Sequence, residues 1–442
     1  MVRMRFTPIM AAFVAAAILI PATLAAHTTF QRTFGGPGRD SGCSVRQTAD
    51  GGYVIAGTTE SYGAGRQDVY LVRTDSSGNV LWSCTYGGES LDYGNSVSQT
   101  SDGGFIVAGS TESYGAGYAD MYLIRTDAHG ETLWTRTLGG PHDDEATSVL
   151  QTPDGDFTIG GSSVSYSGWS DADPCLASTD SSGSVHWVKA HDIFNWDYGY
   201  SMERTRGGNY VIAGGAYGFI GGRAYVLMAD DKGDEMWTTS YGPEYSRGQA
   251  VLEAADGGIA VVGGDASADR GSVSLVKFGA NGESLWGRKY GDGMGYAAIE
   301  TDDSGFVIAG CTGAGTDAYL VRTNASGDPK WMRIFGGPDN EVLQSVQPTA
   351  DGGYIMTGTT RSYGAGGSDV YLIKTDADGN VGVADGTQKP QATSRRLSTT
   401  VVRSLPEGST VFDPMGRRVA SPKAGIYFVR QSSAVTKVVV PR

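Results

Sequence analysis

The stretch Asp-Gly-Gly-Tyr-Val-Ile-Ala-Gly occupies residues 50–57 and returns as Asp-Gly-Gly-Phe-Ile-Val-Ala-Gly at residues 102–109. Related copies follow, and the second residue of the motif lies at 51, 103, 155, 208, 257, 304 and 352. The steps between copies are 52, 52, 53, 49, 47 and 48 residues. A period in this range is typical of solenoids, propellers and arrays, so the motif predicts seven repeated units.

Each repeat reads as four short strands. In the second repeat, alternating or β-rich sequence occupies residues 96–100, 105–110, 120–126 and 132–138. Turns rich in Gly, Asp and Asn separate these runs, and no helical periodicity is present. Four strands per repeat is the composition of a propeller blade. A parallel β-helix is the rival, but its coils are shorter and lack tight hairpins. We predict an all-β, seven-bladed propeller of four-stranded antiparallel blades.

The two ends of the repeat region complement each other. Tryptophan marks the predicted fourth strand in six repeats, at Trp82, Trp134, Trp187, Trp237, Trp286 and Trp331. After the seventh repeat, the corresponding position is Val383. The missing strand is found at residues 30–36, which match residues 82–88 with Phe30 in the place of Trp82. We therefore predict that the N-terminal strand completes the last blade, closes the ring over residues 27–383 and removes an exposed edge.

The first 26 residues resemble an export signal. Arg3 and Arg5 precede an apolar run, and small residues end at Ala25-Ala26, which is the pattern of a cleaved signal peptide over residues 1–26. A transmembrane anchor is the alternative, but the apolar core is shorter than the ~20 residues that span a bilayer. No later segment is expected to span a membrane. We expect a secreted or cell-surface protein.

Charge divides the chain near residue 390. The formal net charge is −14, of which residues 1–26 contribute +2, residues 27–389 contribute −23 and residues 390–442 contribute +7. An acidic body repels phosphate backbones, so nucleic acid is not an expected partner. The change of sign, behind a polar stretch at residues 384–396, predicts a linker there and a separate small β-domain at residues 397–442.

The cysteines and turn aspartates have structural interpretations. Cys43, Cys84, Cys175 and Cys311 occupy different positions in their repeats, so we expect small apolar residues rather than a disulfide framework. Aspartates of the Asp-x-x-Gly turns, such as Asp75, are expected to cap the turn by accepting N–H bonds, with metal binding as the alternative. No cofactor is expected; calcium is the ion we would expect if one binds.

Acids recur at the entry to five repeats. Asp40, Asp92, Asp144, Asp197 and Glu341 occupy equivalent positions, on the face expected to carry the loops between second and third strands. One hypothesis is that these acids ring the channel mouth and bind a cation. The alternative is that each carboxylate accepts N–H bonds in its own loop or from the next blade.

The fourth repeat breaks the pattern most sharply. Residues 191–200 read His-Asp-Ile-Phe-Asn-Trp-Asp-Tyr-Gly-Tyr, where other repeats have Tyr-Gly-Gly-x-x-x-Asp. Aromatic rings beside carboxylates suit sugar stacking with hydroxyl acceptors, although local packing is the alternative. The candidate ligand-binding residues are Trp169, His191, Asp192, Phe194, Trp196, Asp197, Tyr198 and Tyr217. We predict a glycan- or peptide-binding site there.

An enzyme is the less favoured interpretation. The sequence has no Gly-x-Ser-x-Gly elbow, His-Glu-x-x-His motif or phosphate loop. Asp192 and Asp197 could pair as the carboxylates of a glycoside hydrolase or lyase. Two acids in one acidic loop are, however, common by chance. We name no catalytic residue.

Two family resemblances follow from these motifs. The Asp-Gly-Gly-[Tyr/Phe]-x-[Ile/Val]-x-Gly and Asp-x-x-Gly-x-x-x-Trp elements over residues 28–383 resemble the seven-bladed propeller repeats of bacterial and archaeal surface proteins. They are loosely similar to quinoprotein blades, but no quinone-binding residues can be placed.

The tail resembles the C-terminal sorting domain of type IX secretion substrates. The resemblance rests on Val-Phe-Asp-Pro-Met-Gly-Arg-Arg-Val at 411–419, Gly-Ile-Tyr-Phe-Val-Arg at 425–430 and Lys-Val-Val-Val at 437–440, with Pro414 as a departure. It implies a small β-sandwich-like domain at 397–442, recognised by the secretion machinery and then removed. A plain adhesive β-module is the alternative.

Overall fold

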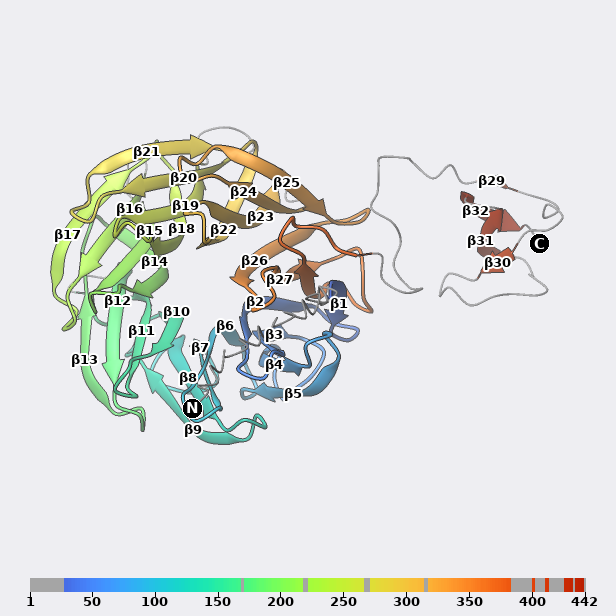
Figure 1. Cartoon of the computed structure of the whole chain (residues 1–442). Helices are drawn as coiled ribbons and strands as arrows, with labels where there is room; N and C mark the ends of the chain where they lie inside the picture. Colours follow the sequence, from blue (N-terminus) through green and yellow to red (C-terminus); the bar gives the residue numbers. More distant parts are fainter. Residues whose placement is uncertain are drawn as a thin grey trace, which may run out of the picture.

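Seven four-stranded antiparallel sheets are arranged as blades around a central channel (Figure 1). The computed structural model describes residues 28–167, 171–217, 222–265, 271–313 and 317–382, and four strands between residues 400 and 440. Among these residues, no helix has the length and apolarity needed to cross a membrane. The predicted all-β, seven-bladed propeller is confirmed.

Each blade runs from an inner strand at the channel to an outer strand. Blade 1 contains β2 (Asp40–Gln47), β3 (Tyr53–Thr59), β4 (Asp68–Thr74) and β5 (Val80–Tyr86). Blade 2 contains β6 (Asp92–Gln99), β7 (Phe105–Thr111), β8 (Asp120–Thr126) and β9 (Thr132–Leu138). Blade 3 contains β10 (Asp144–Gln151), β11 (Phe157–Ser163), β12 (Asp173–Thr179) and β13 (Val185–Ala190).

The remaining blades follow the same order until the last. Blade 4 contains β14 (Trp196–Arg204), β15 (Tyr210–Tyr217), β16 (Arg223–Ala229) and β17 (Glu235–Tyr241). Blade 5 contains β18 (Arg247–Glu253), β19 (Ile259–Asp265), β20 (Ser272–Phe278) and β21 (Ser284–Lys289). Blade 6 contains β22 (Gly293–Glu300), β23 (Phe306–Thr312), β24 (Ala318–Thr323) and β25 (Pro329–Phe335). Blade 7 contains β26 (Glu341–Pro348), β27 (Tyr354–Thr360), β28 (Asp369–Thr375) and β1 (Phe30–Phe34).

The N-terminal strand closes the ring, as predicted. β1 pairs antiparallel with β28, with Phe30 opposite Lys374. The Phe30 ring packs edge-on against Tyr53 of blade 1 at 6.0 Å. Trp82 packs against Phe105 of blade 2 in the same way, at 5.9 Å. Phe30 therefore takes the structural place of the blade tryptophan.

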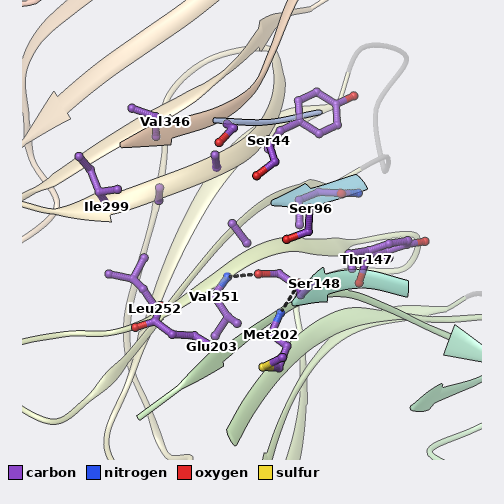
Figure 2. Close-up of a pocket in the computed structure, with 18 of the residues that line it drawn as sticks. Ser44, Ser96, Thr147, Ser148, Met202, Glu203, Val251, Leu252, Ile299 and Val346 are labelled. Carbon is purple, nitrogen blue, oxygen red and sulfur yellow. Dashed lines mark hydrogen bonds between the residues drawn. The ribbon is translucent and has the colours of Figure 1, made fainter. Parts of the chain in front are cut away.

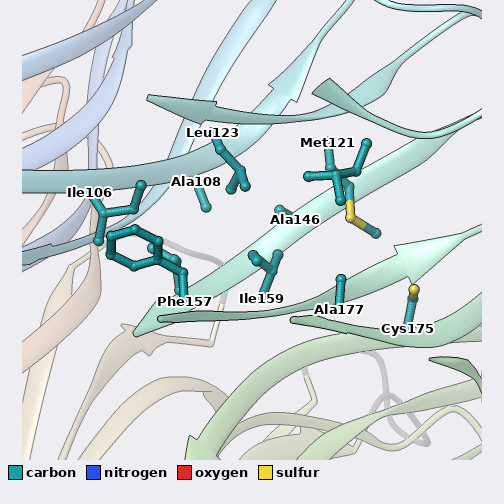
Figure 3. Packing of buried hydrophobic residues seen from close by; sticks show 11 residues of the cluster. Ile106, Ala108, Met121, Leu123, Ala146, Phe157, Ile159, Cys175 and Ala177 are labelled. Carbon is teal, nitrogen blue, oxygen red and sulfur yellow. The ribbon is translucent and has the colours of Figure 1, made fainter. Parts of the chain in front are cut away.

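The hydrophobic core lies between adjacent blades. Figure 3 shows the cluster shared by blades 2 and 3, where Ile106 and Leu123 face Phe157 and Ile159. All four side chains are essentially buried. A blade therefore buries its apolar faces only against its neighbours, and ring closure removes the last exposed face.

The aspartate of the Asp-Gly-Gly motif forms an ion pair with a buried arginine or lysine side chain. The Arg73 guanidinium is 5% exposed and lies 2.5 Å from the Asp50 carboxylate. A Cβ at Gly52 would lie 2.3 Å from Arg73 Nη1 and from the Thr74 carbonyl, so the second glycine is required. The same ion pair joins Asp102–Arg125, Asp256–Lys277, Asp303–Arg322 and Asp351–Lys374.

Blades 3 and 4 have lost this ion pair as a unit. They carry Asp156 and Asn209 in place of the glycine, and Ser178 and Met228 in place of the basic residue. The glycine and the cation disappear together because the glycine makes room for the cation. The motif is therefore structural.

The turn aspartates cap their turns, as predicted. Asp75 Oδ1 accepts the N–H groups of Ser77 and Asn79 at 2.8 and 2.9 Å. All four cysteines are unpaired; Cys175 and Cys311 are buried, whereas Cys43 and Cys84 are partly exposed.

The C-terminal strands form one described sheet. Its order is β29 (Thr400–Val401), β32 (Ala434–Val440), β31 (Gly425–Gln431) and β30 (Thr410–Phe412). β29 runs parallel to β32, and the other pairs are antiparallel. A second sheet is not described, so the sandwich-like arrangement is not supported. The predicted signal peptide and linker lie outside the described residues.

Candidate functional site

The central channel forms a cavity of about 810 Å³ lined by the inner strands (Figure 2). Each inner strand carries one extra residue relative to its partner, a β-bulge that directs a side chain toward the channel. The bulged residues are Cys43, Asn95, Thr147, Tyr200, Gln249, Tyr296 and Gln344, and all line the cavity.

Serine hydroxyls next to the bulges connect neighbouring blades. Ser96 Oγ accepts the N–H of Val149 at 3.2 Å, and Ser148 Oγ accepts that of Met202 at 3.1 Å (Figure 2). Ser44, Ser201 and Ser345 make equivalent bonds to the next blade. Ala250 and Ala297 occupy this position in blades 5 and 6. The serines of the channel wall therefore have a structural role, because their hydrogen bonds join neighbouring blades.

The five entry acids are the first or second residues of inner strands and are buried at about 1% exposure or less. Asp40 is typical: its Oδ2 accepts the Gly36 N–H at 2.8 Å and the Ser61 hydroxyl at 2.6 Å, while its Oδ1 accepts the Thr59 hydroxyl. Within the described residues, no three of these acids approach closely enough to share an ion. The N–H-accepting alternative matches all five acids, since each accepts at least one backbone N–H bond from its own entry loop.

A second acid approaches each entry acid from the preceding blade. Asp68, at the start of β4, lies near Asp92, and the pair flanks Gly87. A Cβ at Gly87 would lie 2.5 Å from an oxygen of each carboxylate. Glycine occupies this position at four such junctions, namely Gly35, Gly87, Gly139 and Gly336, with the built Cβ 2.1–2.6 Å from both acids. The glycine separates two carboxylates without filling the space between them.

The junction of blades 3 and 4 departs from this rule. Asp173 and Asp197 form the acidic pair, and Asp192 replaces the glycine. One carboxylate oxygen from each of these three residues lies within 4.8 Å of the others. Two ionised carboxylates about 4 Å apart repel by on the order of 4 kcal/mol at an effective dielectric constant of about 20.

The protonation of this cluster reflects its burial. Burial, followed by the charges of Asp192, Asp171 and Asp197, raises the pKa of Asp173 to about 7. Burial also raises the pKa of Asp197 to about 6, against the N–H bonds from Phe194 and Ile193. These carboxylates therefore bind protons more readily than ordinary aspartates do.

The aromatic residues of the entry loop form a patch beside these acids. Phe194 and Trp196 are 60% and 46% exposed. Tyr198 stacks on Tyr200 at 6.3 Å and meets Tyr217 edge-on at 5.9 Å. The Tyr200 and Tyr217 hydroxyls are 3.1 Å apart. The cluster extends from the exposed loop to the channel, which Tyr200 lines.

The structure separates the predicted site residues into two groups. Asp192, Phe194, Trp196, Tyr198 and Tyr217 come together around the loop. His191 is 8% exposed, and burial lowers its pKa, so it is a packing residue between blades. Trp169 lies outside the described residues. Asp197 is completely buried and cannot reach a glycosidic bond, which argues against its role as a hydrolase carboxylate.

Asp173 was missed by the sequence analysis. It occupies the repeat position of Asp68, Asp120 and Asp369, each at the start of a third strand. Aligning the first residues of the third strands would have identified an acid at position 173. Its proximity to the next blade's entry acid depends on the ring geometry, which the spacing of the motifs does not reveal.

Comparison with known proteins supports the fold and little more. No family model matches the chain. Regulatory protein FlaEY of Caulobacter vibrioides is 32% identical over 138 residues, which span 28% of this chain and only 14% of that protein. Hydrazine synthase of Kuenenia stuttgartiensis matches with a TM-score of 0.52 and 13% identity, covering 78% of this chain and 98% of that one. Sqt1 of Chaetomium thermophilum, solved with the N-terminus of ribosomal protein L10, has a TM-score of 0.48 and 12% identity, covering 79% and 100%.

Proposed function

We propose that this protein is an exported binding propeller that holds a glycan on the loop face of blades 3 and 4. The supporting observation is the pair of exposed rings, Phe194 and Trp196, beside the acidic cluster. Flat aromatic faces stack on the C–H faces of sugars, and carboxylates accept their hydroxyl hydrogen bonds. A peptide ligand is the alternative that the same experiment distinguishes.

The symmetry of the ring favours this location. Residues that recur from blade to blade serve the blade, as the Asp50–Arg73 pair and its four equivalents do. Blade 4 gives up glycines in its entry loop and places two large apolar side chains in solvent. Exposing such side chains contributes nothing to the core, so a ligand is the better explanation for their retention.

A glycan array probed with the full chain tests the proposal. The double variant Phe194→Ala/Trp196→Ala should weaken binding to the retained glycans by at least about tenfold, because stacked aromatic residues dominate such sites. Tyr118→Ala is the matched control, since Tyr118 is 75% exposed on blade 2. Undiminished retention by the double variant would reject the site. Retention on a peptide array alone would favour the peptide ligand, and product release from a bound glycan would favour the hydrolase or lyase alternative.

We further propose that residues 397–442 direct the chain through an outer membrane by type IX secretion. The support is the spacing of sequence elements at 411–419, 425–430 and 437–440, of which the last two fall within β31 and β32. Removing residues 397–442 in a type IX-competent host should retain the propeller in the periplasm. Secretion of the truncated chain at the normal level would contradict this role.

A further inference from the structure

We propose that the junction of blades 3 and 4 binds a calcium ion through the carboxylates of Asp173, Asp192 and Asp197. The proposal is independent of the glycan-binding role, because it concerns the ion alone. It differs from a ring of entry acids, since only Asp197 belongs to that set and the other two ligands come from a different strand and loop.

The oxygen geometry fits calcium. The three carboxylate oxygens lie within 4.8 Å of one another. Calcium binds oxygens at 2.3–2.6 Å, so two ligands on opposite sides of one ion are separated by about 5 Å at most. Magnesium usually keeps several waters and binds through one or two carboxylates, whereas calcium readily accepts three or more protein oxygens. An all-oxygen site without His or Cys is the chemistry that a hard cation prefers.

Two buried oxygens in this cluster have no hydrogen-bond partner. Asp173 is 2% exposed, and its Oδ1 is unpartnered. At the other four junctions, the Oδ1 atom of the corresponding acid is the one facing the glycine position that Asp192 occupies here. Asp197 is fully buried, and its Oδ1 is also unpartnered. Orphaned carboxylate oxygens are costly in a protein interior, and a bound cation would satisfy them.

The lost partners are visible by comparison with other blades. Thr59 faces Asp40 across the β2–β3 pair and donates its hydroxyl to Oδ1. Ala216 faces Asp197 at the same register and cannot donate. The sequence also places Gly218 where blade 1 has Ser61. Asp197 is therefore retained at positions where the hydroxyl donors that blade 1 provides to Asp40 have been replaced.

The charge of Asp192 also favours a bound cation. Replacing a glycine by Asp192 adds negative charge between two carboxylates. In the described part of the chain, no Lys or Arg forms an ion pair with any of the three. Without a cation, the loss of hydroxyl donors to Asp197 and the gain of the Asp192 carboxylate each destabilise this junction. With a bound cation, the same three carboxylates form a set of oxygen ligands.

The ion would act on the exposed loop. Asp197 Oδ2 accepts the N–H groups of Ile193 at 2.9 Å and Phe194 at 2.5 Å. A calcium ion that fixes this carboxylate therefore also fixes the backbone carrying Phe194 and Trp196.

Calcium titration of the EDTA-treated full chain tests the site by calorimetry and thermal unfolding. Calcium over roughly 10⁻⁵ to 10⁻² M spans the affinities of extracellular calcium modules. We expect saturable binding and a rise in Tm, with magnesium at equal concentration giving weaker binding. Asp192→Gly restores the residue of the other junctions and should weaken calcium binding by at least about tenfold. Glu89→Gln is the matched control, since it removes an exposed acid from the corresponding loop of blade 2.

The stability of Asp192→Gly in EDTA separates a ligand from a purely structural residue. As a ligand in a cluster without its ion, Asp192 destabilises the fold, so the variant should melt above the wild type in EDTA and fail to gain from calcium. Ala216→Thr, which supplies a donor to Asp197, should also weaken calcium binding. Absence of saturable binding to the wild type, or unchanged binding by Asp192→Gly, would overturn the proposal, and equal affinity for magnesium would overturn its assignment to calcium.

Discussion

The junction of blades 1 and 2 and the junction of blades 3 and 4 use the same scaffold for different ends. At the first, Asp68 and Asp92 flank Gly87, and Thr111 and Ser113 hydroxyls satisfy Asp92. At the second, the acidic pair remains, but the glycine is Asp192 and the threonine is Ala216. A repeat thus supplies a buried carboxylate at every such junction, and a few substitutions convert one of them from a structural element into a candidate ligand set.

The largest change in stability is expected at the junction that β1 completes. Deleting residues 28–36 removes β1 and exposes the edge of β28, together with the core that Phe30 and Phe34 fill. We expect a loss of at least about 5 kcal/mol, because each buried phenylalanine alone is worth about 3–5 kcal/mol. Chemical denaturation and light scattering would measure the loss and the resulting aggregation. A trimmed chain that melts like the intact one would contradict the role assigned to this strand.

Transferring the irregular residue to a regular junction should have the next largest effect. Gly87→Asp places a third carboxylate where a Cβ would already lie 2.5 Å from two others. We expect destabilisation of about 4 kcal/mol, because the added carboxylate repels its two neighbours at an effective dielectric constant of about 20. Urea denaturation in EDTA measures it, with Gly87→Ala separating the steric part from the charge. Equal stability of Gly87→Asp and the wild type would show that this position tolerates an acid without special surroundings.

The serine ring gives a smaller, reciprocal test. Ser96→Ala leaves the buried Val149 N–H without its partner and should cost about 1–3 kcal/mol. Ala250→Ser adds the hydroxyl where blade 5 lacks it and should stabilise by up to about 1 kcal/mol. The free energy of unfolding of each variant, compared with that of the wild type, checks the prediction. A neutral Ser96→Ala would indicate that water replaces the hydroxyl.

The smallest effect is expected from pH at the channel wall, where Glu203 stands in blade 4 and Gln347 in blade 7. Burial, followed by the charge of Glu253, raises the pKa of Glu203 to about 7. Because the folded pKa lies above that of the unfolded chain, its protonated form stabilises the fold at low pH. That contribution is lost as pH rises from about 4.5 through 7.

Glu203→Gln should therefore flatten this part of the stability profile by less than about 2 kcal/mol, after allowance for solvent in the channel. Unfolding free energies from pH 4 to 8 measure the difference, with Gln347→Ala as a control on the same wall. A profile identical to the wild type would mean that Glu203 titrates normally.

Most of the fold, and half of the site, could be predicted from local sequence. Phe30 was recognised as the missing blade tryptophan because side chains that wedge two sheets recur at fixed spacing. The exposure of Phe194 and Trp196 followed from the break in symmetry. His191, one of the candidate ligand-binding residues, is buried, and among the described residues no three entry acids come close enough to share an ion. Both outcomes depend on how neighbouring blades pack together, which the sequence of a single repeat does not reveal.

The sequence by itself determined the seven blades, the four strands in each and the borrowed closing strand, because β-alternation and turn glycines are local constraints that repeat along the chain. Only the tertiary structure decided which acids meet. Asp173 begins the third strand of one blade and Asp197 is the second residue of the first strand of the next, and their carboxylates come together through the packing of one sheet on another. Proximity between blades depends on ring curvature and inter-sheet distance, which arise from the packing of the whole ring rather than from any single repeat.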